Sequence, residues 1–443
     1  MTSEGNGVGR LDGIPVFVPL TAVGDQALVK IVKVHKSYCY GRLEAVERPS
    51  PDRLVPDCAA FAQCGGCCYR HISYDSELRL KEQLVRDAFE RLGKLKTVHL
   101  PIIGSERVDA YRNKAQFPVG VGADGRLFAG FYAARSHRII PCGGCLLHRP
   151  IFEKIKQIVL EYAEQYKISA YDERTGKGLL RHICIRAAEQ TGELMLTLVT
   201  TRETLPGIET LIKRMNSEVP AVVSIVNNIN RKDTNVILGE QCITIFGKPY
   251  ITDILCGRRI NISSLSFYQV NRDQAERLYQ AAAAFAGLDG SQTLVDLYCG
   301  AGTIGLSMAD RVKRLIGVEV IPQAVENARQ NAAQNGIQNA EFLCGDAAQA
   351  THQLAEQGLT PDVVIVDPPR KGCAVSVLAD IAEMSPARIV MISCNPATAA
   401  RDCALLEQLG YRAQRVQAVD LFPRTAHVEC VILLERMNKI ANF

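Results

Sequence analysis

The sequence predicts an α/β protein with three parts. Residues 256–443 are expected to form a doubly wound sheet, residues 1–57 a small β-barrel, and residues 58–255 a mixed α+β domain between them. Two observations support this division. Apolar and polar positions alternate over residues 14–47, as in antiparallel strands, whereas short apolar runs separated by helical stretches follow Asn261, as in strands covered on both faces.

Composition narrows the class of protein. A chain of 443 residues exceeds what one hydrophobic core usually supports, and 47% hydrophobic with 22% charged residues is typical of a globular protein. The net charge of +4 means that any basic surface is local. The start, MTSEGNGVGR, lacks the apolar core of a secretory signal, and no apolar stretch is long enough to span a bilayer. We therefore expect a cytoplasmic protein with no membrane partner, whose 16 cysteines are metal ligands, nucleophiles or buried residues rather than disulfides.

The expected barrel carries Lys30, Lys33 and Lys36 along its strands. These lysines suit either contact with a phosphate backbone or a simple solvated face. Beyond the barrel, apolar residues recur at helical spacing over 75–92, and Gly93 is a plausible helix end.

Six apolar runs are expected to be the strands of the carboxyl-terminal sheet. They cover residues 293–297, 314–318, 340–343, 362–366, 388–392 and 428–434. In an open α/β sheet, ligands bind at the carboxyl ends of such strands.

A glycine turn follows the first of these strands, with glycines at 300, 302 and 305 ahead of a helix. Glycine lets the backbone approach a ligand closely, and this spacing fits a dinucleotide as well as a methyl donor. Glu319 ends the next strand, where a carboxylate can accept hydrogen bonds from both hydroxyls of a ribose.

Further acids lie at or near strand ends: Asp296, Asp346, placed to meet an adenine edge, and Asp367. Each of them could be only a helix cap. A shared crevice explains them together, so we expect a cofactor site there.

Cys394 follows an apolar strand, and Asn395 and Pro396 after it are typical of a helix start. The partial positive charge of a helix amino terminus would lower the pKa of this thiol, which favours a nucleophile over a buried small residue. Glu429 opens the last apolar strand. It suits either a partly buried base with a raised pKa or an edge-strand ion pair.

Two cysteine motifs, Cys58-x5-Cys64-Gly-Gly-Cys67 and Cys142-Gly-Gly-Cys145, precede this region. One cysteine pair from each motif would make a zinc site. Three ligands from the first loop and one distant cysteine would instead suit an iron-sulfur cluster. Spacing alone leaves both open, and thioredoxin-like chemistry is less favoured because no βαβ context surrounds either motif.

These motifs, together with Gly13-Ile-Pro-Val-Phe-Val-Pro, Phe267-Tyr-Gln269, Ser-Cys394-Asn-Pro and His-Val-Glu429, resemble the RNA uracil-C5 methyltransferases, specifically the branch that acts on 23S ribosomal RNA. The likeness covers nearly the whole chain. It implies a Rossmann-like S-adenosylmethionine-dependent domain, an amino-terminal TRAM (OB-like) RNA-binding barrel, and a central domain that carries a [4Fe-4S] cluster.

The resemblance also implies roles for single residues. Cys394 is the nucleophile and Glu429 the base. Cys58, Cys64, Cys67 and Cys145 hold the cluster, with Cys142 as an extra thiol. The expected cofactor pocket, which combines the family's ligands with the glycine turn and the acids described above, comprises Gln269, Tyr298, Gly300, Gly302, Thr303, Glu319, Asp346 and Asp367.

The chemistry that follows is an addition to carbon 6 of uracil by the Cys394 thiolate, which makes carbon 5 nucleophilic enough to take a methyl group. The partner implied is 23S rRNA with a flipped uridine, and we expect a monomer. A tRNA target shares the same motifs. An adenine or cytosine amino-methyltransferase would use Asp367-Pro-Pro, but its usual aromatic residue is replaced by Arg370, and Cys394 and Glu429 would have no role. A non-enzymatic RNA-binding protein would not need the donor pocket.

Overall fold

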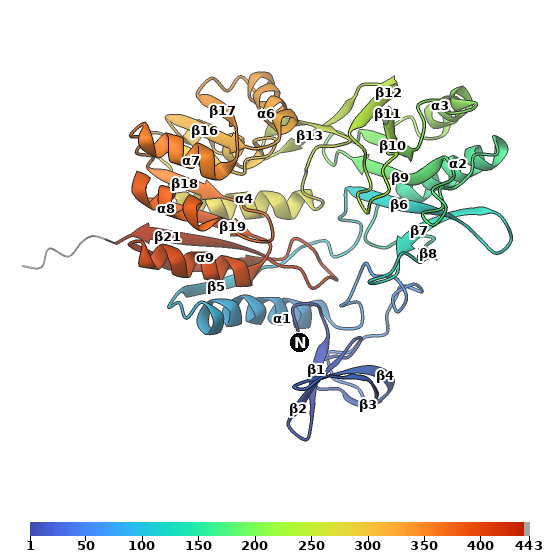
Figure 1. Cartoon of the computed structure of the whole chain (residues 1–443), viewed down its shortest axis with the longest axis horizontal. Helices are drawn as coiled ribbons and strands as arrows, with labels where there is room; N and C mark the ends of the chain where they lie inside the picture. Colours follow the sequence, from blue (N-terminus) through green and yellow to red (C-terminus); the bar gives the residue numbers. More distant parts are fainter. Residues whose placement is uncertain (438–443) are drawn as a thin grey trace, which may run out of the picture.

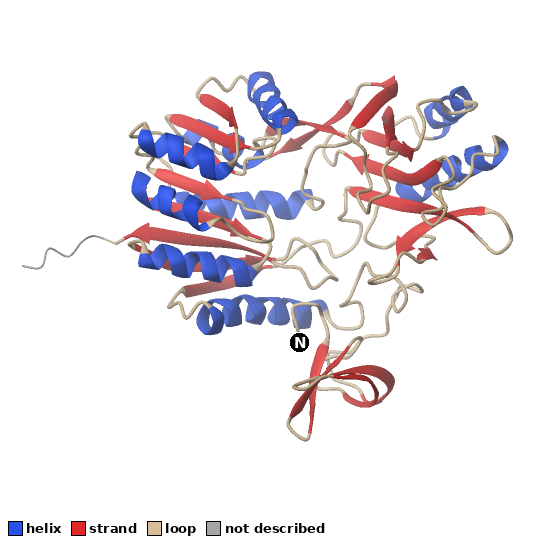
Figure 2. Cartoon of the chain, in the orientation of Figure 1, coloured by secondary structure: helices blue, strands red, loops and turns tan. Residues whose placement is uncertain are grey.

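A computed structural model describes residues 1–437 of the protein. The chain forms a small barrel, a central sheet and a carboxyl-terminal sheet, which follow one another from blue to red in Figure 1. Figure 2 shows that helices flank both larger sheets, whereas the barrel is built of strands and loops. Among the described residues, no helix is long and apolar enough to cross a membrane.

The amino-terminal barrel contains four strands in the order β1-β2-β4-β3. Its core is small, with Val16, Val18 and Cys39 buried and Val29 and Leu43 packed against them. The barrel lies at the bottom of Figure 1, on the edge of the molecule. Its strands are β1 (Gly7–Leu11), β2 (Ile14–Val18), β3 (Gln26–Val34) and β4 (Cys39–Arg48).

The central sheet has seven strands in the order β12-β11-β10-β9-β6-β7-β8. Helices α2 (Pro150–Gln165) and α3 (Ile208–Glu218) pack apolar side chains on one of its faces. The strands are β6 (Lys114–Val121), β7 (Leu127–Tyr132), β8 (Ile139–Pro141), β9 (Leu180–Ala187), β10 (Leu194–Thr200), β11 (Val222–Ile229) and β12 (Gln241–Gly247).

A hairpin of β13 (Tyr250–Leu255) and β14 (Arg258–Ser263) leads from the central sheet to the carboxyl-terminal one. The boundary expected between residues 255 and 256 falls in the turn of this hairpin. Helix α4 (Arg272–Ala286) then packs on the carboxyl-terminal sheet.

The carboxyl-terminal sheet has eight strands in the order β17-β16-β15-β18-β19-β21-β20-β5. It is doubly wound, because separate apolar clusters fill the space between each face and its helices. Its strands are β15 (Thr293–Leu297), β16 (Arg314–Glu319), β17 (Ala340–Cys344), β18 (Val363–Val366), β19 (Arg388–Ser393), β20 (Tyr411–Val419) and β21 (Glu429–Arg436). Its helices are α5 (Thr303–Ser307), a 3-10 turn (Ala309–Arg311), α6 (Pro322–Gln334), α7 (Ala347–Glu356), α8 (Val375–Met384) and α9 (Pro396–Gln408). Each of the six predicted runs coincides with one strand to within two residues.

One segment packs elsewhere than the sequence indicated. Strand β5 (Val98–Ile103) pairs in parallel with β20 and forms the last strand of the carboxyl-terminal sheet. Helix α1 (Tyr74–Asp87), which continues as a π-helical turn (Ala88–Leu92), buries Val85 and Phe89 against the same sheet. Residues 74–103, grouped above with the central domain, therefore complete the carboxyl-terminal one. Their sequence contains no signal for this long-range pairing.

Candidate active site

A cavity of about 670 Å³ opens at the carboxyl ends of β15, β16, β18 and β19. Strand β16 pairs with one side of β15, and β18 pairs with the other side. Open α/β sheets bind ligands at such a point, where the strand order reverses. Seven of the predicted site residues line this one cavity: Gln269, Tyr298, Gly300, Glu319, Asp367, Cys394 and Glu429.

The turn after β15 needs a left-handed backbone at Tyr298 (φ 63°), Gly300 (φ 55°) and Gly302 (φ 78°). A side chain on Gly300 would meet no protein atom within 4 Å, so this glycine leaves room for a ligand. A side chain on Gly302 would come within 3.1 Å of Leu306 Cδ1, because α5 packs closely there. The two glycines therefore have different functions.

Glu319 is held at the rim of the cavity by two backbone amides. One carboxylate oxygen accepts from the Gly300 amide at 3.1 Å and the other from the Ile321 amide at 2.9 Å. These bonds fix a negative charge at the end of β16, in the position expected for a ribose-binding acid.

Three of the predicted cofactor residues do not line the cavity. The Thr303 hydroxyl lies 3.1 Å from the Tyr279 hydroxyl. Asp346 caps helix α7, since its carboxylate accepts from the Ala348 amide at 2.9 Å. Gly302 faces other protein atoms, since a side chain there would meet Leu306, Phe342 and Ala328. Contact between Asp346 and a bound donor stays a prediction.

Asp296 is buried below the glycine turn and accepts from the Gly305 amide at 2.9 Å. Burial raises the pKa of this carboxyl to about 7. Asp296 therefore stabilises the turn from within the sheet.

Cys394 follows β19 and precedes the cap of α9, where the Asn395 side chain accepts from the Ala397 amide at 3.2 Å. The expectation of a lowered thiol pKa is wrong for this structure. Half-burial of Cys394 and the nearby Glu429 carboxylate raise the pKa of the thiol, and the neighbouring Arg370 guanidinium acts in the opposite direction. Loss of water around the sulfur is the largest of these effects.

Glu429 lies beside Cys394 because of strand register. The antiparallel ladder between β19 and β21 includes the pair Ser393 and Cys430, so the next residues of the two strands face each other at its end. Glu429 is 4% exposed. Burial and the carboxylate of Asp367 raise the pKa of Glu429 to about 8.

Arg370 is a site residue that sequence reasoning missed. Its guanidinium lies near the Cys394 thiol and acts to lower the pKa of that thiol, and its carbonyl accepts from the Asn395 side chain at 3.1 Å. The signal was the position after Asp367-Pro-Pro, where an arginine replaces the aromatic residue of amino-methyltransferases. This arginine places a positive charge beside the candidate nucleophile.

The loop between β20 and β21 brings Phe422 and His427 to the cavity. A buried lysine on α1 anchors this loop. Lys81 Nζ lies 2.7 Å from both Glu77 and Asp420, and it donates to the Phe422 carbonyl at 3.1 Å. Helix α1 therefore takes part in positioning the loop over the cavity.

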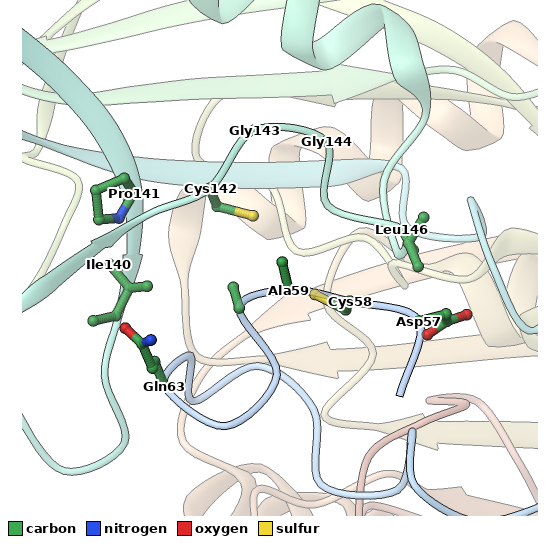
Figure 3. A pocket seen from close by; sticks show the side chains of 11 residues that line it. Asp57, Cys58, Ala59, Gln63, Ile140, Pro141, Cys142, Gly143, Gly144 and Leu146 are labelled. Atoms are coloured by element: carbon green, nitrogen blue, oxygen red, sulfur yellow. The ribbon is translucent and has the colours of Figure 1, made fainter. Parts of the chain in front are cut away.

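A second cavity, of about 70 Å³, is lined by five cysteines together with Arg70, Arg112 and His148. The cysteines are Cys58, Cys64, Cys67, Cys142 and Cys145. Figure 3 shows Cys58 and Cys142, which come from two different loops, at a neighbouring open cavity of about 500 Å³. Within residues 1–437, no group of three or more histidine, cysteine, aspartate or glutamate side chains is arranged to hold a metal ion.

The cysteine loop is also tied to the active-site loop. The amides of Cys68 and Tyr69 donate to the Arg424 carbonyl at 2.9 and 3.1 Å. These two bonds connect the loop that carries the cysteines to the loop between β20 and β21 that lies at the cavity.

Comparison with known proteins gives matches over almost the whole chain. Residues 240–437 match the family described as tRNA (Uracil-5-)-methyltransferase, and residues 1–43 match the TRAM domain, as predicted. An uncharacterized RNA methyltransferase of Halalkalibacterium halodurans is 45% identical over 439 residues, 99% of this chain and 96% of that protein. One of Clostridium acetobutylicum is 44% identical over 438 residues, 98% and 95% of the two chains.

Among solved structures, the chain is similar to Pyrococcus abyssi tRNA (uracil-54, C5)-methyltransferase in complex with S-adenosyl-L-homocysteine. The TM-score is 0.77 at 27% identity, and the match covers 97% of this chain and 100% of that one. The fold, the match of the amino-terminal domain and the full-length relatives all indicate the same family. The chain belongs to the S-adenosylmethionine-dependent RNA (uracil-5-)-methyltransferase family.

Proposed function

We propose that this protein, acting as a monomer, methylates carbon 5 of a uridine in 23S rRNA through a covalent adduct with Cys394. The observation that carries this proposal is the position of Cys394 and Glu429 side by side on the wall of the cavity that also holds the glycine turn. An amino-methyltransferase would leave both side chains without a role.

The cavity suits S-adenosylmethionine. The open space at Gly300 admits a ligand against the backbone, and Glu319 is held where it can bind a ribose. Gln269 and Tyr298 line the same space. When bound there, S-adenosylmethionine supplies an electrophilic methyl group.

The reaction begins at Cys394. Its Sγ proton leaves to solvent, and the Arg370 guanidinium stabilises the thiolate. The sulfur bonds to carbon 6 of the flipped base, the 5,6 double bond opens, and negative charge moves to oxygen 4 as an enolate. The enolate electrons then form the bond between carbon 5 and the methyl group while the bond from that methyl group to the donor's sulfonium sulfur breaks, so that a neutral thioether would leave.

Glu429 completes the reaction. In its ionised form, which is the minor form at neutral pH, Glu429 takes the carbon 5 proton, the 5,6 double bond forms again, and the bond between Sγ and carbon 6 breaks to release the thiolate. A pKa of about 8 suits this task, because a general base transfers protons most efficiently when its pKa lies near the working pH.

The mechanism is tested with RNA that carries 5-fluorouridine, in which carbon 5 has no proton to lose. We expect a stable protein–RNA adduct that requires S-adenosylmethionine and maps to Cys394 by mass spectrometry. No adduct, or an adduct elsewhere, would refute the mechanism.

We also propose that Cys58, Cys64, Cys67 and Cys145 hold a [4Fe-4S] cluster with a structural role. Thiolates are the ligands such clusters use, and these four surround one cavity beside the positive charge of Arg70.

The cluster proposal is tested by metal analysis of protein purified without oxygen. We expect about four iron atoms and no zinc, and one zinc without iron would overturn the proposal. Cys145→Ala should lose the iron and Cys142→Ala should retain it. The reverse would reassign the fourth ligand.

The target RNA is proposed from the sequence resemblance to the 23S rRNA branch. A tRNA target is the second candidate, since the Pyrococcus abyssi relative acts on tRNA. Mapping of 5-methyluridine in rRNA and tRNA from cells that lack the protein separates the two. Loss from tRNA alone would exclude the rRNA assignment.

A further inference from the structure

The small cavity of about 70 Å³ is lined by more thiols than the proposed cluster uses. Five cysteines surround it, whereas a [4Fe-4S] cluster takes four thiolates. The proposed ligands leave Cys142 as an extra thiol. Within residues 1–437, Cys142 belongs to none of the apolar clusters that pack the sheets and the barrel, so core packing does not explain it.

Cys142 lies between the small cavity and a larger one that opens to solvent. It lines both the cavity of about 70 Å³ and the neighbouring cavity of about 500 Å³. Figure 3 shows its side chain at the larger cavity, which exposed residues such as Gln63 and Gly143 also line. A molecule as small as hydrogen peroxide can therefore reach this thiol from solvent before it reaches the proposed cluster ligands.

A short anchored loop holds Cys142 next to Cys145. Lys156 Nζ, on helix α2, donates to the Cys142 carbonyl at 2.5 Å, and the Gly144 amide donates to the Glu153 carboxylate at 3.0 Å. The Cys142 thiol lies near the Cys145 thiol and acts to lower its pKa. Since only two glycines separate the cysteines, joining their sulfurs closes a very short loop at little entropic cost.

We propose that Cys142 is a site of oxidation that forms a reversible disulfide with Cys145 after the cluster has been lost. The inference rests on the proposed cluster and its ligand set. In the first step, hydrogen peroxide transfers an oxygen atom to Cys142 Sγ, so that the thiol becomes a sulfenic acid and the peroxide becomes water.

The second step joins the two sulfurs. Cys145 Sγ bonds to Cys142 Sγ, the bond between Cys142 Sγ and oxygen breaks, and the hydroxide leaves with the proton of Cys145 as a second water. In total the two sulfurs lose two electrons and two protons, and both oxygen atoms of the peroxide end as water. No other reactant is needed.

The disulfide preserves Cys145 as a ligand. A bare thiol that meets more peroxide oxidises further to a sulfinic acid, which thiols do not reduce. A disulfide instead returns to two thiols when a dithiol attacks it. The extra thiol therefore keeps the site able to bind iron again.

Peptide mapping of the unmodified protein tests the disulfide. Protein purified without oxygen is treated with hydrogen peroxide until its visible absorbance is lost, and the free thiols are then alkylated. Residues 139–154 form one tryptic peptide, since proline follows Arg149, and this peptide contains Cys142, Cys145 and no other cysteine. We expect it to be unalkylated and lighter by two hydrogen atoms. Alkylation of both cysteines, or a link from Cys142 to Cys58, would overturn the proposal.

Rebinding of iron tests what the disulfide does. After peroxide treatment, the unmodified protein should regain its iron and absorbance when dithiothreitol, ferrous iron and sulfide are added without oxygen, and should fail to regain them without dithiothreitol. Cys142→Ser should lose this recovery, because its Cys145 oxidises to a sulfinic acid. Cys242→Ser, which changes an exposed cysteine on β12, is the matched control and should recover like the unmodified protein. Equal recovery by Cys142→Ser and the control would refute the protective role.

The two proposals about these cysteines can fail separately. Iron content before peroxide treatment tests the cluster, and the mass of peptide 139–154 after treatment tests the disulfide. The disulfide can also form in protein that holds no iron. Zinc in place of iron would therefore refute the cluster and leave the peptide mass as an independent result.

Discussion

Glu429→Gln should make the protein more stable while it blocks release of the product. The carboxyl of Glu429 is buried and its pKa is raised from 4.5 to about 8. Between these two values the unfolded chain has lost the proton and the folded protein keeps it. The stability of the unmodified protein therefore falls as pH rises from about 4.5 to about 8, and glutamine removes this dependence.

The size of the effect follows from the shift. One pKa unit corresponds to about 1.4 kcal/mol, so the penalty accumulates to about 3 kcal/mol at pH 7. We expect the unfolding midpoint of Glu429→Gln to exceed that of the unmodified protein by on the order of 5 °C at pH 8, and by little at pH 5. Differential scanning calorimetry at both pH values measures this difference.

The matched control is Glu435→Gln on the same strand. Its side chain is 41% exposed and lies 3.6 Å from Arg388, so its effect on the midpoint should be small and similar at both pH values. An equal midpoint difference at pH 5 and pH 8 for Glu429→Gln would contradict a buried, protonated carboxyl.

The same variant reports on catalysis. Without the carboxylate, methylation of the base can precede a proton loss that no longer occurs, so a covalent protein–RNA species should accumulate. Denaturing gel electrophoresis with labelled RNA detects it. Release of methylated RNA at the normal rate would show that Glu429 is not the base.

Three further variants test other parts of the site. Cys394→Ala should abolish turnover, because the proposed mechanism needs the thiol to bond to the uracil ring. Calorimetry should still detect binding of S-adenosylmethionine, and loss of that binding would show that Cys394 has a structural role. Gly300→Ala should weaken donor binding at least about tenfold, since the added methyl group enters the cavity. Gly336→Ala is the control and should bind the donor normally, because Gly336 has the same left-handed backbone but faces open space. Equal donor binding by the two variants would remove Gly300 from the donor site. Lys81→Met should lower the free energy of unfolding by about 3–5 kcal/mol, because it leaves the Asp420 carboxylate buried without its ion pair. A change below about 1 kcal/mol in a denaturant titration would mean that this network does not anchor the loop.

Local patterns predicted the carboxyl-terminal strands well, because strands covered on both faces are apolar throughout. They did not predict that β5 joins β20 across more than three hundred residues of sequence. A pairing of this kind depends on which edge is free after the sheet has formed, and no local pattern records it.

The same limit applies within the site. The position of Cys394 before a helix suggested a lowered pKa, but the folded chain half-buries the thiol and brings a carboxylate next to it. Asp346 illustrates the alternative that the sequence left open, since its side chain caps α7. In both cases the surroundings, which come from distant segments, decide the behaviour of the group.

The sequence alone determined which reactive groups stand at the strand ends, because a thiol, a carboxylate and a glycine turn are local features of the chain. The tertiary structure decided how these groups act together. It placed Glu429 across from Cys394, brought Arg370 to the thiol, and used a buried lysine of α1 to fix the loop above them. These relations depend on register and burial, which arise only when segments far apart in the chain pack against each other.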